Sequence, residues 1–357
     1  MTAEEIFRGR LVMAPMTRGT DLPFRRLAAE WGATVCMGEM AYAHKVVRNE
    51  GNERTLLRRH PDEPVFGVQL AGKRPDVMAD AAVIAEDAGA DFVDVNLGCP
   101  IDDATRRGFG AALLERPSRV AAIVSAMKGR VRVPVTVKLR LGWSSERPTF
   151  LKIARAAEDA GADAVALHAR SRSQRYRRPA DWSRVRLLAE TLRVPVIGNG
   201  DVGSWRAAIG RAEETGCHAV MVGRSGLTKP WLFREYADRR DLVLDTEERL
   251  TVLRRYVDLC REHFGDDEFG RRRTRRFLAF HQDFFRRYRP DGDDVDLDED
   301  DPRDAAEPRS ELDGWLARGD VDAVDRLCDW LVDGAAANPP APAEPGAQRA
   351  VKTAAYG

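Results

Sequence analysis

Residues 93–114, VDVNLGCPIDDATRRGFGAALL, contain the unit that repeats along this chain: a buried strand, a polar turn and a loop that leads into a helix. The apolar start, residues 92–97, has the pattern of a strand that is covered on both faces. A glycine and a proline flank Cys99, so this thiol is presented on a turn at the carboxyl end of the strand. A lone cysteine is more often a small buried thiol, but one beside the amide of Asn96 is also a candidate nucleophile or catalytic acid.

The composition of the 357-residue chain is that of a globular protein with one large domain and a smaller one. Lys and Arg number 57, as do Asp and Glu, so the net charge favours no class of partner. Five widely spaced cysteines form no CxxC pair, which argues against a zinc site and a disulfide framework. No apolar run has the length of a membrane span or a signal core. We therefore expect a cytoplasmic protein with no membrane contact and no metal site.

Eight short apolar runs alternate with amphipathic helical segments between residues 10 and 240. The first run ends in Ala-Pro-Met and lacks the glycine-rich turn of a doubly wound sheet. Eight βα units over about 230 residues predict an α/β fold, the (β/α)8 TIM barrel. The runs are residues 11–16, 34–40, 65–70, 92–97, 135–139, 164–168, 194–198 and 219–222.

Polar side chains stand where these expected strands end, on the rim that carries the active site in such barrels. Lys138 is informative because an ammonium within a buried strand is costly unless it is paired. Taken singly, a histidine such as His168 is more often a hydrogen-bonded core residue than a functional one, and a glutamine such as Gln69 is more often an ordinary rim residue. Core packing does not explain why polar residues follow almost every strand on the same rim. The rim residues are Pro15, Met16, Glu39, Met40, Gln69, Asn96, Cys99, Lys138, Arg140, His168, Arg170, Asn199, Gly200, Asp201, Gly223 and Arg224.

The loops after the seventh and eighth runs indicate a phosphate site. They read GNGD at 198–201 and GR at 223–224, and loops in these places commonly bind phosphate in (β/α)8 barrels. Glycines let backbone N–H groups approach an anion, and the arginine adds positive charge. With Gln69, Lys138 and His168, the pattern is similar to that of FMN-binding barrels, in which Gln69 would contact the flavin edge and Lys138 its N1–O2 side.

Seven motifs resemble those of the tRNA-dihydrouridine synthases, a family of flavin enzymes. The segment from NLGCP to GAALL is specific by itself, and the others add weight together. The seven are MAPM at 13–16, GVQLAG at 67–72, DVNLGCP at 94–100, GFGAALL at 108–114, VKLRLG at 137–142, GNGD at 198–201 and VGR at 222–224. Four more stretches resemble the tRNA-dihydrouridine(47) synthase branch, without its zinc-finger extension. These are CPIDDATRRGFG at 99–110, HARSRSQRYRRPADW at 168–182, KPWLF at 229–233 and KTAAYG at 352–357.

The resemblance implies a reaction and a role for each rim residue. NADPH would reduce a bound FMN, a uridine flipped out of tRNA would receive hydride at carbon 6, and Cys99 would donate a proton to carbon 5. Unstacking a base costs a few kcal/mol, which contacts to its edge offset. The resemblance assigns the cofactor to Pro15, Met16, Gln69, Lys138, His168, Asn199, Gly200, Asp201, Gly223 and Arg224. It assigns the substrate to Asn96, Arg140 and Arg170, and it implies no protein partner.

The composition changes after residue 240, and residues 241–334 predict a smaller helical domain. Residues 249–290 hold 12 Arg and six acids, and apolar residues between 277 and 288 have helical spacing. The alternatives are a solvated helix with a core stripe and an RNA-binding face, and the resemblance favours RNA. The candidate RNA contacts are Arg272, Arg275 and Arg276.

The rest of the chain gives three further expectations. Residues 291–304, DGDDVDLDEDDPRD, predict a solvated acidic loop that lacks the order of ligands of an EF-hand. A helical segment is expected over residues 310–332, and a flexible Pro/Ala-rich tail over residues 335–357.

Two other functions remain as alternatives. An FMN barrel that acts on a small molecule would account for the rim residues but not for the basic second domain. A non-catalytic RNA-binding protein on the same scaffold is disfavoured by the presence of Asn96, Cys99 and Lys138 together.

Overall fold

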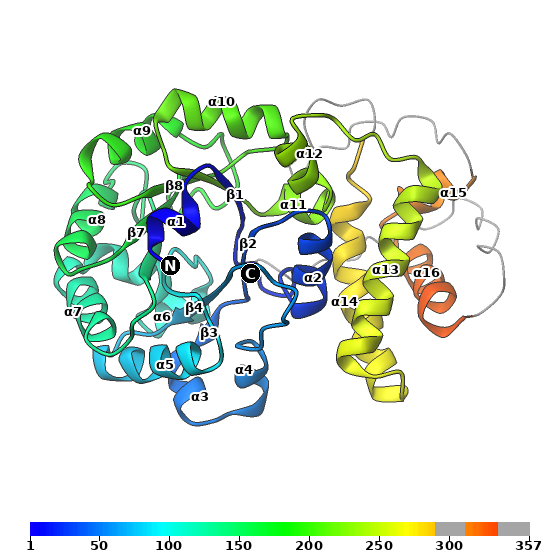
Figure 1. The fold of residues 1–357 in the computed structure, drawn as a ribbon, viewed down its shortest axis with the longest axis horizontal. Coiled ribbons are helices and arrows are strands. Elements are labelled where there is room, and N and C mark those ends of the chain that lie inside the picture. The colour runs from blue at the N-terminus through cyan, green and yellow to red at the C-terminus, as the bar shows by residue number, and fades with distance from the viewer. Residues whose placement is uncertain (290–310, 335–357) are drawn as a thin grey trace.

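The computed structural model describes residues 1–289 and 311–334, and it shows a closed barrel of parallel strands with helices around it and further helices packed on one side (Figure 1). The strands follow the order β2-β1-β9-β8-β7-β6-β5-β4-β3, and a pairing of β2 with β4 closes the ring. The strands are β1 Arg10–Met13, β2 Val35–Met37, β3 Ala41–Tyr42, β4 Phe66–Ala71, β5 Phe92–Leu97, β6 Val135–Arg140, β7 Ala164–His168, β8 Val196–Asn199 and β9 Ala219–Val222.

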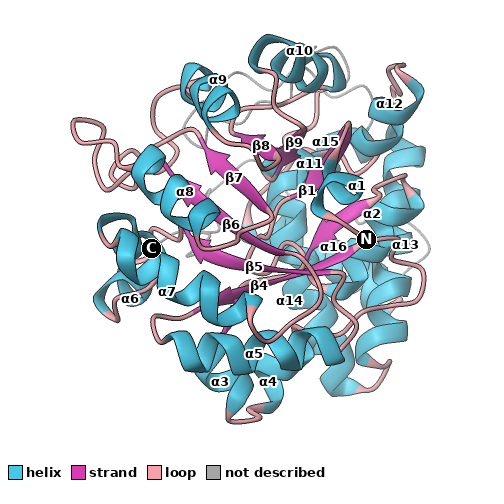
Figure 2. Cartoon of the chain, turned by 60° about the vertical axis from the view of Figure 1, so that its left-hand side comes forward, coloured by secondary structure: helices cyan, strands magenta, loops and turns pink. Residues whose placement is uncertain are grey.

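The predicted (β/α)8 barrel is confirmed, and each of the eight apolar runs contains one strand of the ring. The short strand β3 was not predicted. It pairs with the end of β4, while β2 pairs with the start of β4. The second run was expected to extend to residue 40, but β2 ends at Met37 and residues 38–40 form no strand. Figure 2 shows the strands inside the ring of helices, with their arrowheads toward the same end of the barrel.

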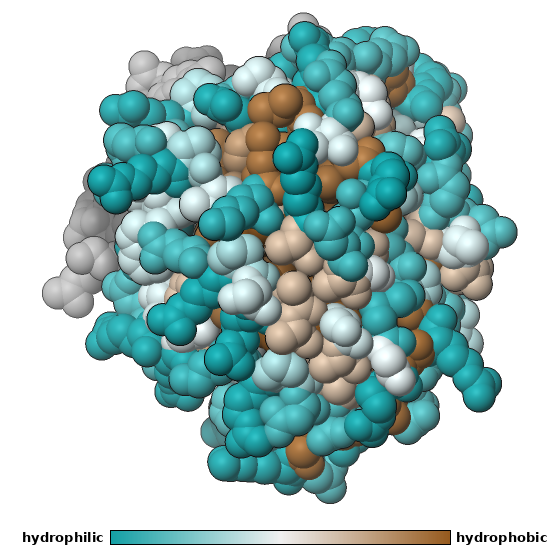
Figure 3. Space-filling model, turned by 90° about the vertical axis from the view of Figure 1, so that its left-hand side faces the viewer, coloured by the Kyte–Doolittle hydropathy of each residue, from teal (hydrophilic) through white to brown (hydrophobic). Residues whose placement is uncertain are grey.

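Helices cover the outside of the barrel, and α1 (Ala3–Phe7) covers its amino-terminal end, where Phe7 packs edge to face on Phe92 at 5.2 Å. Figure 3 shows that hydrophilic residues dominate one outer face, with a small hydrophobic patch among them. Within the described residues, no helix combines the length and the apolarity that a membrane crossing requires. The outer helices are α2 Leu22–Glu30, α3 Ala43–Val47, α4 Gly51–Thr55, α5 Pro75–Asp87, α6 Asp102–Arg106, α7 Pro117–Lys128, α8 Phe150–Asp159, α9 Trp182–Thr191, α10 Trp205–Thr215, α11 Arg224–Thr228 and α12 Leu232–Asp238, with a 3-10 helix at Gly110–Glu115.

A helical bundle follows the barrel, formed by α13 Thr246–Phe264, α14 Glu268–Phe285, α15 Glu311–Leu316 and α16 Val321–Asp333. Its α13 packs on α2 and its α14 packs on α11. Trp231, fully buried after α11, has its ring 5.0 Å from that of Tyr288 and 6.0 Å from that of Phe285. Because one apolar core runs through barrel and bundle, the division into domains at residue 240 stays a prediction.

The helical segment expected over residues 310–332 consists, in its described part, of two helices, α15 and α16. The break lies at Gly319, where an added Cβ would be 2.3 Å from Nε of Arg286. Asp320 then caps α16 by accepting the backbone N–H of Ala323 at 3.0 Å. The expected acidic loop at 291–304 and the tail at 335–357 lie outside the described residues.

Asp21 joins the barrel to the bundle. Its carboxylate caps α2 by accepting the N–H of Phe24 at 2.8 Å, and it accepts the hydroxyl of Tyr256 from α13 at 2.9 Å. The Nε2 atom of His281 on α14 lies 3.3 Å from the same carboxylate, and all three side chains are buried. One carboxylate therefore joins α2 to two helices of the bundle that lie far from it in the sequence.

We expect Asp21→Ala to lower the free energy of unfolding by about 2–4 kcal/mol, because it removes a helix cap and leaves a buried hydroxyl unpaired. The matched control is Asp245→Ala, which removes the exposed cap of α13 and no contact between helices. Urea unfolding followed by circular dichroism measures both. Equal losses in the two variants would show that the contacts of Asp21 with the bundle contribute nothing.

Candidate active site

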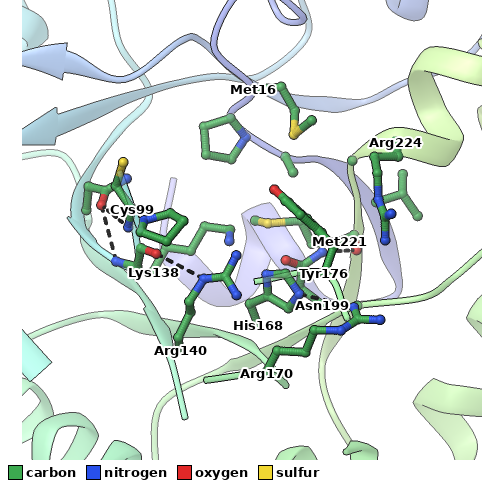
Figure 4. Close-up of a pocket in the computed structure, with 18 of the residues that line it drawn as sticks. Met16, Cys99, Lys138, Arg140, His168, Arg170, Tyr176, Asn199, Met221 and Arg224 are labelled. Carbon is green, nitrogen blue, oxygen red and sulfur yellow. Dashed lines mark hydrogen bonds between the residues drawn. The ribbon is translucent and has the colours of Figure 1, made fainter. Parts of the chain in front are cut away.

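A cavity opens at the carboxyl ends of the barrel strands (Figure 4). Its walls bound about 1160 Å³ of space, a volume that includes open solvent. All barrel residues with a predicted role in binding or catalysis line this cavity. They are Pro15, Met16, Gln69, Asn96, Cys99, Lys138, Arg140, His168, Arg170, Asn199, Gly200, Asp201, Gly223 and Arg224. The structure thus brings them together, although their individual roles stay predictions.

Asn96 fixes the turn that carries Cys99. Its Oδ1 atom accepts the backbone N–H of Gly98 at 3.2 Å and that of Cys99 at 2.9 Å. The carbonyl of Cys99 accepts the N–H of Ala111 at 3.0 Å, so the glycine-rich loop lies directly on the turn. Gly110 permits this approach, because it has a φ of +63° and an added Cβ would lie 2.9 Å from that carbonyl oxygen.

The Cys99 thiol is suited to hold a proton. Burial raises its pKa above the ordinary 9.0, while Arg140 and Lys138 lower it by less. The group is therefore a protonated thiol at neutral pH, which can donate a proton but is a poor nucleophile. Of the five cysteines, Cys99 is partly exposed and the other four are buried.

Positive charge dominates the cavity wall. Five cationic side chains and one carboxylate line it, and these are Lys138, Arg140, Arg170, Arg175, Arg224 and Asp201. Burial lowers the pKa of Lys138 to about 8, and within the described residues its ammonium has no hydrogen-bond or ion-pair partner. Burial and the neighbouring cations hold the pKa of His168 well below 6.5, so this imidazole is neutral at pH 7. The excess of cations makes an anionic ligand the natural occupant.

Two of these arginines are held by Asp201. Its carboxylate is 2.5 Å from Nη2 of Arg170 and 3.4 Å from Nη2 of Arg224. The ring of Tyr176 lies beside the pair, with its centroid 4.6 Å from the guanidinium carbon of Arg224 and 5.6 Å from that of Arg140. Sequence reasoning missed Tyr176 and Arg175 as cavity residues. The one signal for them was their place in the motif at residues 168–182, because spacing does not reveal that this loop folds back over the rim.

The arginines predicted to contact RNA lie on α14, outside the cavity. Arg275 forms ion pairs with Asp329, at 2.6 Å, and with Asp333, so it holds α14 to α16. Arg272 and Arg276 are exposed, and Arg272 lies with its guanidinium carbon 5.5 Å from the ring centre of Phe269, itself 54% exposed. The structure thus gives Arg275 a packing role and leaves Arg272 and Arg276 at the surface.

Residues 12–301 match the profile of the family described as Dihydrouridine synthase (Dus), which covers most of the chain. The chain belongs to the dihydrouridine synthase family. The tRNA-dihydrouridine(47) synthase [NAD(P)(+)] of Malassezia globosa is 38% identical over 310 residues, which cover 80% of this chain and 40% of that protein. The tRNA-dihydrouridine(47) synthase [NAD(P)(+)]-like protein of Homo sapiens is 40% identical over 287 residues, which cover 80% of this chain and 44% of that protein.

The family and branch predicted from the sequence are confirmed by these comparisons. This chain spans less than half the length of these curated relatives. More distant solved structures share the barrel fold alone. Histamine dehydrogenase from Rhizobium sp. 4-9 has a TM-score of 0.51 at 14% identity, covering 70% of this chain and 49% of its own. 2-Naphthoyl-CoA reductase also has a TM-score of 0.51 at 14% identity, covering 65% of this chain and 50% of its own.

We expect iodoacetamide to alkylate Cys99 before the four buried cysteines, at a rate that still rises above pH 9. Alkylation requires the thiolate, and burial raises the pKa of this thiol above 9.0. Peptide mass mapping across pH 6–10 measures the rate, with Cys99→Ser as the control that abolishes fast labelling. A rate that levels off near pH 7 would identify an activated thiolate, and Cys99 would then be a nucleophile rather than an acid.

Proposed function

We propose that this chain is the catalytic part of a cytoplasmic tRNA-dihydrouridine synthase, which uses FMN and NADPH to reduce the 5,6 double bond of a uridine in tRNA. The single observation that carries the proposal is the protonated Cys99 thiol on the rim of a cavity with excess positive charge. The membership in the dihydrouridine synthase family and the names of the relatives support the reaction. The cytoplasmic location rests on five free cysteines.

The cavity fits FMN by the chemistry of its wall. A flavin, when bound, supplies hydride to an electron-poor carbon. The unpaired ammonium of Lys138 would stabilise negative charge on the flavin ring, and Gln69 would hydrogen-bond its edge. Arg170 and Arg224 would bind the phosphate group, beside the glycines at 200 and 223. An added Cβ at Gly223 would lie 3.2 Å from Sδ of Met16, so a glycine here leaves room for the Met16 side chain beside the backbone.

The remaining polar side chains would hold the base and move one proton. Arg140 donates from Nε to the carbonyl of Gly98 at 3.0 Å and from Nη1 to the carbonyls of Ser171 and Arg175. Within the described residues, the hydrogens of its Nη2 have no acceptor, so they are available to a pyrimidine carbonyl. The Cys99 thiol would donate its proton to carbon 5 of the base.

The exposed Arg272, Arg276 and Phe269 of α14 support tRNA as the partner, because arginines neutralise phosphates and an aromatic ring stacks on bases. The two alternatives differ in what they predict for RNA. An FMN barrel for a small molecule would reduce its substrate without RNA, and a non-catalytic RNA-binding protein would form no dihydrouridine.

We expect Cys99→Ala to retain flavin reduction by NADPH but to form dihydrouridine roughly 10²–10⁴-fold more slowly, the usual cost of losing a general acid. Stopped-flow absorbance follows the first step, and dihydrouridine in unmodified tRNA follows the second. Cys217→Ala is the matched control, because its thiol is buried outside the cavity. Dihydrouridine formation at the wild-type rate would remove Cys99 from the reaction.

We expect Arg272→Ala/Arg276→Ala to weaken tRNA binding and to leave NADPH oxidation without RNA unchanged. Each phosphate contact contributes roughly 0.7–0.9 to the slope of log affinity against log salt, so the slope should fall by about one or two contacts. Filter binding from 50 to 300 mM salt measures it. Arg275→Ala is the comparison, since it should lower stability by loosening α16. An unchanged slope in the double variant would place the RNA site elsewhere.

A further inference from the structure

A chain of hydrogen bonds inside the barrel ends on the Cys99 turn. The carboxylate of Asp94 on β5 accepts from Nε2 of Gln69 on β4 at 2.7 Å. Oε1 of Gln69 accepts from Nδ2 of Asn96 at 2.6 Å, and Oδ1 of Asn96 accepts the N–H of Cys99. The second oxygen of Asp94 accepts the hydroxyl of Thr136 on β6 at 2.6 Å. Asp94 and Gln69 are each 1% exposed, so this end of the series of hydrogen bonds is buried.

The two ends of this chain fix the orientation of the two amides between them. An amide presents either its oxygen or its nitrogen to a neighbour, whereas an ionised carboxylate only accepts and a backbone N–H only donates. Asp94 therefore turns Nε2 of Gln69 toward itself, and the N–H of Cys99 turns Oδ1 of Asn96 toward the turn. The amides must run head to tail, which is the arrangement that the structure shows.

This arrangement determines what the cavity offers to a ligand. Gln69 and Asn96 both line the cavity, and each uses one hydrogen of its amide nitrogen within the chain of hydrogen bonds. Within the described residues, the second hydrogen of each nitrogen has no acceptor. Each amide nitrogen of these two lining residues thus has one N–H left for a ligand, while each amide oxygen already accepts within the hydrogen-bond chain, a pattern that matches a ring edge with carbonyl oxygens better than one with an amino group.

We propose that Asp94 is a positioning residue that holds Gln69 and Asn96 with their N–H groups toward the cavity, and so selects rings with carbonyl oxygens at that edge. The inference rests on the proposed function for the identity of those rings, which are flavin and uracil. Asp94 itself does not line the cavity, so it acts through the two amides and through the turn of Cys99.

The state of the Asp94 carboxyl is consistent with this role. Burial raises its pKa to about 6, against the opposing effects of Thr136, Gln69 and the Lys138 ammonium. The group is therefore mostly ionised at pH 7.5, where it accepts hydrogen bonds and donates none.

Two substitutions of Asp94 separate hydrogen-bond polarity from charge. Asp94→Asn keeps an oxygen for Gln69, because the hydroxyl of Thr136 can rotate to accept from the new amide nitrogen. Asp94→Leu keeps the branch at Cγ but carries methyl groups in place of the oxygens, so it offers no acceptor and Gln69 is free to turn its oxygen elsewhere. Thr136→Val is the control, because it removes one hydrogen bond to the same carboxylate and leaves the polarity intact.

The first measurement is the affinity of the apoprotein for FMN by fluorescence titration at pH 7.5. We expect Asp94→Leu to bind roughly tenfold more weakly, and Asp94→Asn and Thr136→Val to stay within about threefold of wild type, since one misdirected hydrogen bond accounts for about one order of magnitude. In a double-mutant cycle with Gln69→Leu, Asp94→Leu should add no further loss. Additive losses, or an Asn variant as weak as the Leu variant, would overturn the proposal.

The second measurement is independent of FMN and of RNA. Asp94→Leu should make Cys99 react faster with iodoacetamide at pH 7.5, because Gln69 without its acceptor no longer restrains Asn96 and the turn that Asn96 holds becomes looser, while Asp94→Asn should react as wild type does. Thermal melting checks that each variant is folded. If wild type binds no FMN, the proposed function fails, yet the labelling rates still test the hydrogen-bond chain. Equal labelling rates in all folded variants would show that Asp94 does not position this turn.

Discussion

The pairing of β2 with β4 closes the sheet, and the arrangement of the cavity depends on that closure. In a closed barrel of parallel strands every carboxyl end meets at one rim, so side chains from residue 14 to residue 225 share one cavity although the chain between them is long. An open sheet would place β1 and β4 at separate edges. Met16 and Gln69 would then lie apart, and the loops after β8 and β9 would have no opposite wall.

The same rim concentrates charge where charge is least stable. Arg140 is buried and Lys138 is partly buried, the pKa of each is lowered by desolvation, and the structure supplies a single carboxylate on the cavity wall to offset five cations. Such a site is stabilised by an anionic ligand and destabilised without one. The surrounding core, apolar from the strands to the outer helices, provides the stability that tolerates this arrangement.

The sequence predicted the ring of eight strands and the cavity residues because both follow from local patterns. Buried parallel strands are continuous apolar runs, and the residues after them must share a rim. What escaped prediction depends on contacts between distant segments. The partners of Arg275 lie on α16, the side chain of Arg286 lies against Gly319 between α15 and α16, and Tyr176 reaches the cavity by a loop that folds back. Asp94 was not predicted to have a role, because no local pattern shows that its side chain faces Gln69 on the neighbouring strand.

The position of Asp21 along the chain gives the molecule a mechanical connection. The loop that leads to it begins at Met16 on the cavity wall, and this loop is a tight turn in which the N–H of Met16 donates to Oγ1 of Thr20 at 3.0 Å. Asp21 follows this turn directly, and its carboxylate contacts Tyr256 of α13 and His281 of α14. A displacement of the bundle that moved Asp21 would therefore be passed to Met16 on the cavity wall through this short hydrogen-bonded turn. Were one occupant to change the affinity for another by this route, thermodynamic reciprocity would require the same factor in the reverse direction.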